Sequence, residues 1–303
     1  MKRYFYSIII IIIISFVSCE NLQTVIDVDL STHEPKLVVN SVNQVGEKWK
    51  AYVSVSQAPL SSNDFVFLND ALVILTEGDI NLDTLIFNIS KNRYESSLIV
   101  QEGTNFGIRV SHSNYNSIYA TLFPFQKVLI KSVEELHNFS SETTSLKFTI
   151  DDPQSTNYYM ANLKAYYSQV PLDSSEILYE DYSETEKIDF YSDDFSLNQG
   201  QFSRGKLLFD DKLFNGTTKE FNLLFDVDVS TKADSILLNL WSLDYAFYNY
   251  FTTKIIQSNT ANNPIFNSEP VNVYNSFLDG DSEIQGYGIF AVSSKDSVII
   301  QTD

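Results

Sequence analysis

The sequence has 303 residues, of which 44% are hydrophobic, 14% aromatic and 19% charged, with 10 glycines, 7 prolines and one cysteine. This composition excludes a disordered chain, a collagen-like repeat and a disulfide-stabilised scaffold. The formal net charge of -19 opposes binding to phosphate backbones, so no nucleic-acid partner is expected.

Residues 1–18 predict a secretory signal peptide. Lys2 and Arg3 precede an apolar stretch from Ile8 to Val17. As a helix, about ten residues rise only about 15 Å, which is half the hydrocarbon thickness of a bilayer. The segment is therefore too short to favour a membrane span and fits a cleavable signal.

The end of this segment, Phe16-Val17-Ser18-Cys19, resembles a bacterial lipobox, in which a small residue precedes an acylated cysteine. Cys19 is also the only cysteine of the chain. Several acyl chains, at about 0.8 kcal/mol per buried CH₂, hold a protein firmly at a membrane. The sequence thus predicts lipidation of Cys19 and a mature chain that starts there; the alternative is an ordinary signal peptide with an incidental thiol.

Residues 19–124 favour an immunoglobulin-like or prealbumin-like β-sandwich. Short runs with period-two alternation recur about every 8–12 residues and are separated by Gly, Asn, Asp and Ser, which is typical of antiparallel sandwiches. We expect strands at 25–30, 36–40, 49–56, 71–76, 82–88, 93–100, 105–111 and 118–122. A domain boundary is placed at Pro124, because proline interrupts strand pairing.

Residues 125–303 favour a second β-rich domain, a sandwich or open barrel with one helix, so the fold class is all-β. The expected strands are 127–133, 144–150, 158–168, 186–191, 205–209, 219–229 and 235–243, with two closing strands at 289–292 and 297–302. One helix is predicted near 244–257, with Asp244 as its N-cap.

The chain offers little catalytic machinery. His33, His112 and His137 lie far apart, which disfavours a zinc site, and no nucleophile elbow, Cys–His pair, phosphate loop or dinucleotide fingerprint is present. Acidic turns such as 210–211 and 279–283 lack the regular ligand spacing of a calcium loop, and solvated turns explain them better. We expect no enzyme activity, no metal and no cofactor.

Two features suggest a contact surface. The helix carries aromatic residues on more than one face, so some rings either join the core or meet a partner or ligand together with the following loop. The candidate contact residues are Tyr245, Tyr248, Tyr250, Asn263, Pro264 and Phe266. The strongly acidic stretch 171–228 either docks a basic partner or only solubilises the surface.

Five motifs of the C-terminal half occur in a specific order. They are Asp151-Asp152-Pro153 before Asn157-Tyr158-Tyr159, the turn 210–216, Ser242-Leu243-Asp244-Tyr245, the stretch 263–271, and Gly286-Tyr287-Gly288-Ile289-Phe290. Together with 33–40, they resemble the domain of unknown function 4249 family of acidic Bacteroidota lipoproteins. The turn at 280–286 is looser than is usual in that family. The resemblance implies an outer-membrane lipoprotein, often encoded beside TonB-dependent transporters, with no established activity.

These observations lead to one main functional hypothesis and two alternatives. The main one is a non-enzymatic accessory lipoprotein, anchored to the membrane through acylated Cys19 and docking on a TonB-dependent transporter. The first alternative is a lipoprotein that captures a glycan or a peptide. A hydrolase is the least favoured, and it requires a cleft with two inward carboxylates about 5–9 Å apart.

Overall fold

A computed structural model describes residues 33–58, 66–102, 105–123, 125–134, 137–138, 140, 142–167, 184–198, 200–203, 205–262, 271–278 and 283–302. The chain divides into two compact units, Met1–Glu34 and Pro35–Asp303, and all of the helices and strands named below belong to the second. Cys19 and the predicted strand at 25–30 lie outside the described residues.

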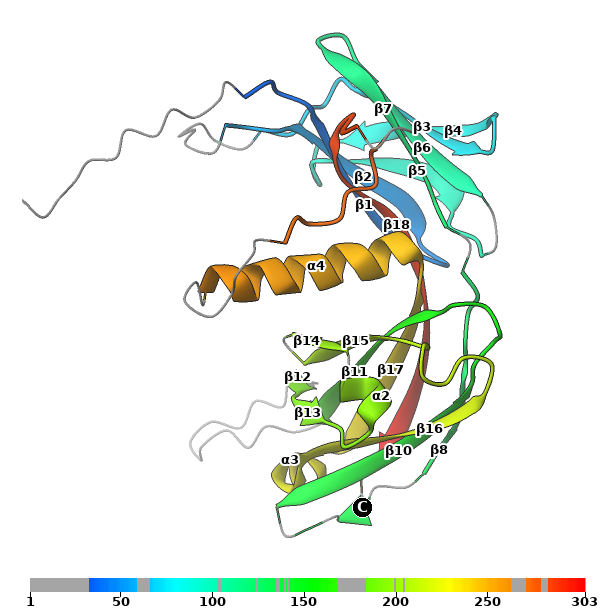
Figure 1. Cartoon of the computed structure of the whole chain (residues 1–303), viewed down its shortest axis with the longest axis vertical. Coiled ribbons are helices and arrows are strands. Elements are labelled where there is room, and N and C mark those ends of the chain that lie inside the picture. The colour runs from blue at the N-terminus through cyan, green and yellow to red at the C-terminus, as the bar shows by residue number, and fades with distance from the viewer. Residues whose placement is uncertain are drawn as a thin grey trace, which may run out of the picture. The chain divides into compact units, whose positions relative to one another are not determined.

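Thirteen of the described strands form one large sheet (Figure 1). Twelve of them lie side by side in the order β14-β15-β11-β17-β18-β1-β2-β5-β4-β3-β6-β7, and the thirteenth, β12, also pairs with β11. Their bounds are β1 Leu37–Gln44, β2 Lys48–Val55, β3 Leu72–Glu77, β4 Ile80–Asn88, β5 Arg93–Ile99, β6 Phe106–His112, β7 Tyr115–Thr121, β11 Tyr158–Tyr167, β12 Glu184–Ile188, β14 Gln201–Ser203, β15 Lys206–Asp210, β17 Ser235–Leu243 and β18 Tyr287–Gln301.

A second sheet has five of the described strands, in the order β13-β16-β10-β8 with β9 also paired to β10. Its strands are β8 Ile130–Val133, β9 His137–Asn138, β10 Thr143–Asp151, β13 Phe190–Tyr191 and β16 Thr218–Asp226. The described helices are α2 Phe195–Asn198, α3 Val227–Lys232 and α4 Tyr245–Asn262. None of them combines the length and apolarity that crossing a membrane requires. The chain is mainly β, which confirms the predicted fold class.

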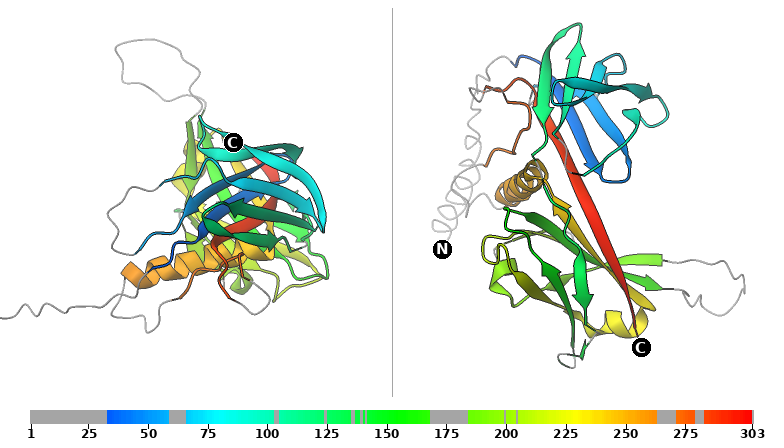
Figure 2. Two further views of the ribbon diagram at one scale, coloured as in Figure 1. Left: turned by 90° about the horizontal axis from the view of Figure 1, so that it is seen from above. Right: turned by 90° about the vertical axis from the view of Figure 1, so that its right-hand side faces the viewer.

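The last strand, β18, connects the two halves of the large sheet. Its first part runs parallel to β1, with Val38 opposite Tyr287, and its second part runs antiparallel to β17, with Leu243 opposite Ser293. Figure 2 shows this strand in red, extending from the blue strands β1 and β2 toward the C-terminus. A single strand therefore belongs to both halves.

Two hydrophobic cores lie on the sheets. The first is built from β1 to β7 and includes Phe277, Phe290 and Val292 from the end of the chain. The indole of Trp49 on β2 stacks on Phe290 of β18, with ring centroids 5.8 Å apart. The second core lies between the large sheet and the five-stranded sheet, where Leu146 and Phe148 of β10 meet Tyr159 and Ala161 of β11. The predicted division at residue 124 stays a prediction.

Several segments differ from the expected elements. The strand expected at 186–191 is divided into β12, which pairs with β11 in the large sheet, and β13, which pairs with β16 in the second sheet. One helix was expected, whereas the described residues also form α2 and α3, and strand β14 was not expected. Residues 227–232 form helix α3 where the strand was expected to continue to 229, because the Asp226 side chain caps the turn by accepting a hydrogen bond from the Asp228 amide at 2.8 Å. The two closing strands are one strand, since Ser294 and Lys295 stay paired with β17 across the polar interval that suggested a break.

Helix α4 covers the face of the large sheet that points away from these cores. Strand residues alternate between faces, so Met160 contacts the helix whereas its neighbours Tyr159 and Ala161 face the core between the sheets. Leu243, Phe247 and Ile289 complete the buried layer under the helix. The helix was predicted for 244–257 and extends to Asn262.

Candidate functional site on the face covered by helix α4

The start of α4 is fixed by a buried carboxylate. Asp244 is fully buried and accepts hydrogen bonds from the amides of Phe247 at 2.7 Å and Val292 at 3.3 Å. The first bond caps the helix, and the second ties it to β18. Burial raises the pKa of Asp244 to about 8, well above the ordinary value of an aspartate. The side chains of the first turn of α4 are thereby held in place against the sheet.

An aromatic patch surrounds the first turn of α4. We define it as Phe123, Tyr158, Tyr245, Tyr248 and Tyr274. Tyr245 is at its centre, with the rings of Phe123, Tyr158 and Tyr274 at 5.0, 5.8 and 5.8 Å and interplanar angles of 65°, 65° and 86°. Tyr245 is 39% exposed and Phe123 is 46% exposed, whereas Tyr248 stacks on Tyr158 at 4.7 Å. The patch thus leaves Tyr245 and Phe123 partly exposed beside the first turn of α4, which Asp244 holds against β18.

The structure brings together only some of the predicted contact residues. Tyr245 and Tyr248 lie in the aromatic patch, but Tyr250 packs edge-on against Phe251 at 5.3 Å, and the Lys254 ammonium stands 5.8 Å from the centre of its ring. The remaining predicted residues, Asn263, Pro264 and Phe266, lie outside the described residues.

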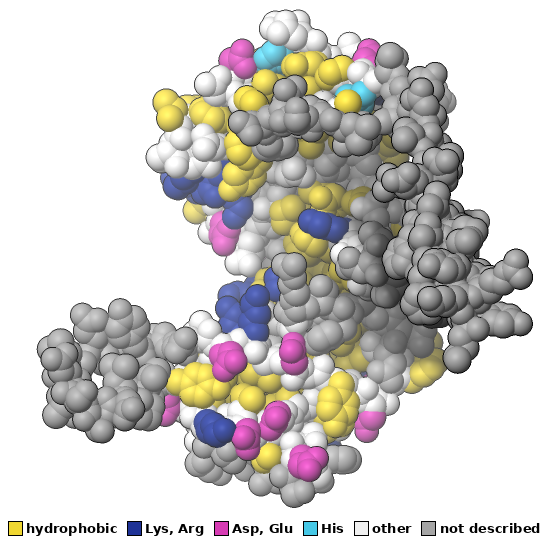
Figure 3. All heavy atoms as spheres, turned by 90° about the vertical axis from the view of Figure 1, so that its left-hand side faces the viewer, with side chains coloured by type: hydrophobic (Ala, Val, Ile, Leu, Met, Phe, Trp, Pro, Cys, Tyr) yellow, Lys and Arg dark blue, Asp and Glu magenta, His cyan; other side chains and the backbone are white. Residues whose placement is uncertain are grey.

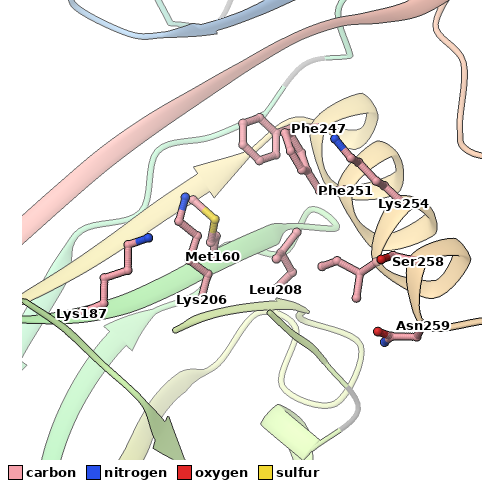
Figure 4. Close-up of a pocket in the computed structure, with 10 residues that line it drawn as sticks. Met160, Lys187, Lys206, Leu208, Phe247, Phe251, Lys254, Ser258 and Asn259 are labelled. Atoms are coloured by element: carbon pink, nitrogen blue, oxygen red, sulfur yellow. The ribbon is translucent and has the colours of Figure 1, made fainter. Parts of the chain in front are cut away.

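A cavity of about 480 Å³ lies between α4 and the strands β11, β12 and β15 (Figure 4). This volume is in the range of small-molecule sites. It is lined by Met160, Lys187, Lys206, Leu208, Phe247, Phe251, Lys254, Ile255, Ser258 and Asn259. Met160, Leu208 and Phe247 are buried, whereas Lys187, Lys254 and Ser258 are exposed. The cavity therefore has an apolar floor and a polar rim.

Sequence inspection missed the three lysines of this cavity, because they come from separate elements: Lys187 from β12, Lys206 from β15 and Lys254 from α4. The signal available in the sequence was that Lys187 and Lys206 occur inside predicted strands of an otherwise acidic stretch. Figure 3 shows basic side chains directly beside hydrophobic ones on this face.

Two of the sequence motifs form a buried polar cluster. The Tyr159 hydroxyl donates to Asp152, and the Gly216 amide donates to the other oxygen of Asp152 at 2.8 Å. The Asn157 amide donates to Asp211 at 2.7 Å. Burial raises the pKa of both carboxyls, and their mutual repulsion raises that of Asp211 further. Asp211 is not exposed at all, so we interpret these motifs as turn anchors and not as a substrate cleft.

Two further acidic turns have local partners, while residues 279–282 lie outside the described residues. Asp194 caps α2 through the Ser196 amide at 2.8 Å and pairs with Lys219 at 2.6 Å, and Asp210 pairs with Lys212 at 2.7 Å. Within the described ranges, no group of three His, Cys, Asp or Glu side chains could hold a metal ion.

Comparison with known proteins gives one family match. The model of a family described as "Domain of unknown function (DUF4249)" matches residues 23–299. No curated protein matches the sequence. One similar solved structure is described as "Complete structure of manganese lipoxygenase of Gaeumannomyces graminis and partial structure of zonadhesin of Komagataella pastoris"; it is 8% identical, with 69% of this chain and 88% of that chain covered and a TM-score of 0.20. At that TM-score it carries no argument.

Proposed function

We propose that this chain, which belongs to the family of domain of unknown function 4249, is a lipid-anchored outer-membrane lipoprotein that docks without catalysis on a TonB-dependent transporter. The lipobox-like segment that ends at Cys19 supports the anchor. The observation that carries the docking role is the aromatic patch at the start of α4.

The geometry of the patch suits a protein partner better than a sugar. Tyrosine and phenylalanine are enriched at the centre of protein interfaces, where they supply contact area at a low entropic cost. The rings around Tyr245 meet edge to face at 65° to 86°, so they do not form the flat platform on which a sugar ring stacks. Asp244 fixes the helix before any partner arrives, which reduces the ordering cost of binding.

The test is a pull-down from native outer membranes in mild detergent, with a tag after Asp303 and mass spectrometry of the captured proteins. We expect a barrel protein at stoichiometric yield with the unmodified chain and none with Cys19→Ala. The patch variant Phe123→Ser with Tyr245→Ser should lower the yield at least fivefold. The matched control is Tyr191→Ser with Phe195→Ser, which removes two aromatic side chains that are 57% and 67% exposed outside the patch.

Either of two results would overturn the docking proposal. One is that the lipidated chain is recovered alone. The other is that the patch variant and the control variant capture the same amount of barrel protein.

Capture of a ligand is the second candidate function, and the cavity beside α4 favours it. A site of about 480 Å³ is too small for a folded partner and has the size of a small-molecule pocket. Docking and capture use different residues of the same helix, so the two functions are compatible.

A further inference from the structure

The cavity beside α4 has two chemically distinct parts. Its floor is apolar and is formed by Met160, Leu208, Phe247, Phe251 and Ile255, of which the first three are buried. Its rim carries Lys187 and Lys206 on the strand side and Lys254 on the helix side (Figure 4). A ligand that satisfies both parts needs an apolar body and a negative charge.

The lysines on the strand side are brought together by strand pairing. Lys164 of β11 is directly opposite Lys187 of β12, and Asn162, two residues before Lys164, is opposite Lys206 of β15. Residues two apart on a strand share a face, so Lys164, Lys187 and Lys206 all lie on the face that α4 covers. Like charges directly opposite each other on a sheet are destabilising.

Among the described residues, no carboxylate forms an ion pair with these charges. In the part of the chain that the structure describes, Lys164, Lys187, Lys206 and Lys254 take part in no ion pair, although the whole protein carries a net charge of -19. Burial, and then the charges of Lys187 and Lys164, lower the pKa of Lys206. An anion bound there would relieve this repulsion.

We propose that this cavity binds an anionic amphiphile, with an acyl chain on the apolar floor and a carboxylate or phosphate headgroup at Lys187 and Lys206. A free inorganic anion leaves the apolar floor empty, and a neutral lipid leaves the lysines uncompensated. The proposal does not rest on docking to a transporter, because the aromatic patch and the cavity have no residue in common.

The probe is a dansyl-labelled undecanoic acid, whose emission rises and shifts to shorter wavelength in an apolar site. It is titrated into the full chain carrying Cys19→Ala, so that no acyl chain of the protein itself competes. The bound probe is then displaced by oleate, by a lysophospholipid with a phosphate headgroup, by oleyl alcohol and by inorganic phosphate. We expect the first two to displace the probe at least tenfold more effectively than the last two, and the stronger of the two anions identifies the headgroup.

The decisive variant is Lys187→Ala with Lys206→Ala, which should weaken probe binding at least tenfold. Its matched control, Lys131→Ala with Lys232→Ala, removes the same charge from two exposed lysines that do not line the cavity. Ile255→Ser, which shortens the apolar floor, should also weaken binding. Far-UV circular dichroism checks that each variant is folded. Lys254→Ala, at an exposed position, is a milder variant that should weaken probe binding about threefold.

Three results would overturn the proposal. The first is that no amphiphile binds the unmodified cavity. The second is equal displacement by oleate and oleyl alcohol, which would show that the lysines do not recognise charge. The third is that both double variants weaken probe binding equally, which would show that binding depends on the net charge of the protein and not on the cavity lysines.

Discussion

Single buried side chains set the chemistry of the α4 face. Asp244 has no exposed surface and holds both the helix and β18, and its two backbone partners come from residues 45 positions apart along the chain. Its N-cap role could be predicted from the sequence, because an aspartate before an apolar helical pattern is a frequent start signal. Its contact with Val292 could not, since that contact depends on the position of a strand far along the chain.

The buried carboxyl of Asp244 makes stability depend on pH. Its pKa is about 8 in the folded chain and near 3.8 when unfolded, so between these values the folded form holds a proton that the unfolded form releases. The free energy of unfolding should therefore be highest near pH 4 and fall as the pH rises toward 8. At about 1.4 kcal/mol per pKa unit, the interval from pH 5 to a pKa of about 8 predicts a loss of up to about 4 kcal/mol between pH 5 and pH 8.5.

Urea unfolding at several pH values checks this expectation. Asp244→Asn carries no titratable group and should flatten most of the decline, while the raised pKa values of Asp152 and Asp211 leave a smaller slope of the same sign. The control is Asp226→Asn at the exposed N-cap of α3, which should keep the slope of the unmodified protein. If the free energy of unfolding of Asp244→Asn declined with pH as steeply as that of the unmodified protein, Asp244 would not be the source of the pH dependence.

At the scale of elements, the sequence predicted those strands that can be recognised from their own residues, without knowledge of which strands they pair with. Strand β17 has the predicted bounds, 235–243, because its residues form a nearly continuous apolar run. The two predicted closing strands proved to be the single strand β18, since Ser293 and Ser294 interrupt the pattern yet pair with Leu243 and Ser242. The cavity lysines escaped prediction for the same physical reason: strand register, which no local pattern contains, brings them together.

The junction of β18 with β1 depends on one glycine. Gly288 has a φ of +116° and is opposite Val39, and a Cβ atom at this position would lie 2.0 Å from the Val39 carbonyl oxygen. Gly288→Ala must therefore push the two backbones apart, and we expect a loss of more than about 3 kcal/mol of folding free energy. Gly46→Ala is the matched control: φ is +89° there but no atom lies within 4 Å, so strain alone should cost about 1–2 kcal/mol. Equal midpoints of chemical denaturation for the two variants would show that the close approach of β18 to Val39 adds no cost beyond backbone strain.

At the scale of the whole chain, the two cores share a strand. Phe290 and Val292 of β18 lie in the core around Trp49, and Ile300 of the same strand packs against the core between the two sheets. A strand that spans two cores couples their unfolding, because opening one core removes a pairing partner from the other. The sequence pattern, which suggested a boundary at Pro124, could not reveal this, since the connecting strand is at the far end of the chain.

We therefore predict that residues 35–302 unfold in one cooperative transition. The chain has two tryptophans, Trp49 in the core of β1 to β7 and Trp241 in the layer under α4, so Trp241→Phe and Trp49→Phe each leave one local reporter. In each variant, the urea midpoint from tryptophan fluorescence should coincide with the midpoint from far-UV circular dichroism, which follows all strands. A separation of more than about 0.5 M between the two midpoints would instead show that the N-terminal sandwich and the C-terminal strands unfold independently.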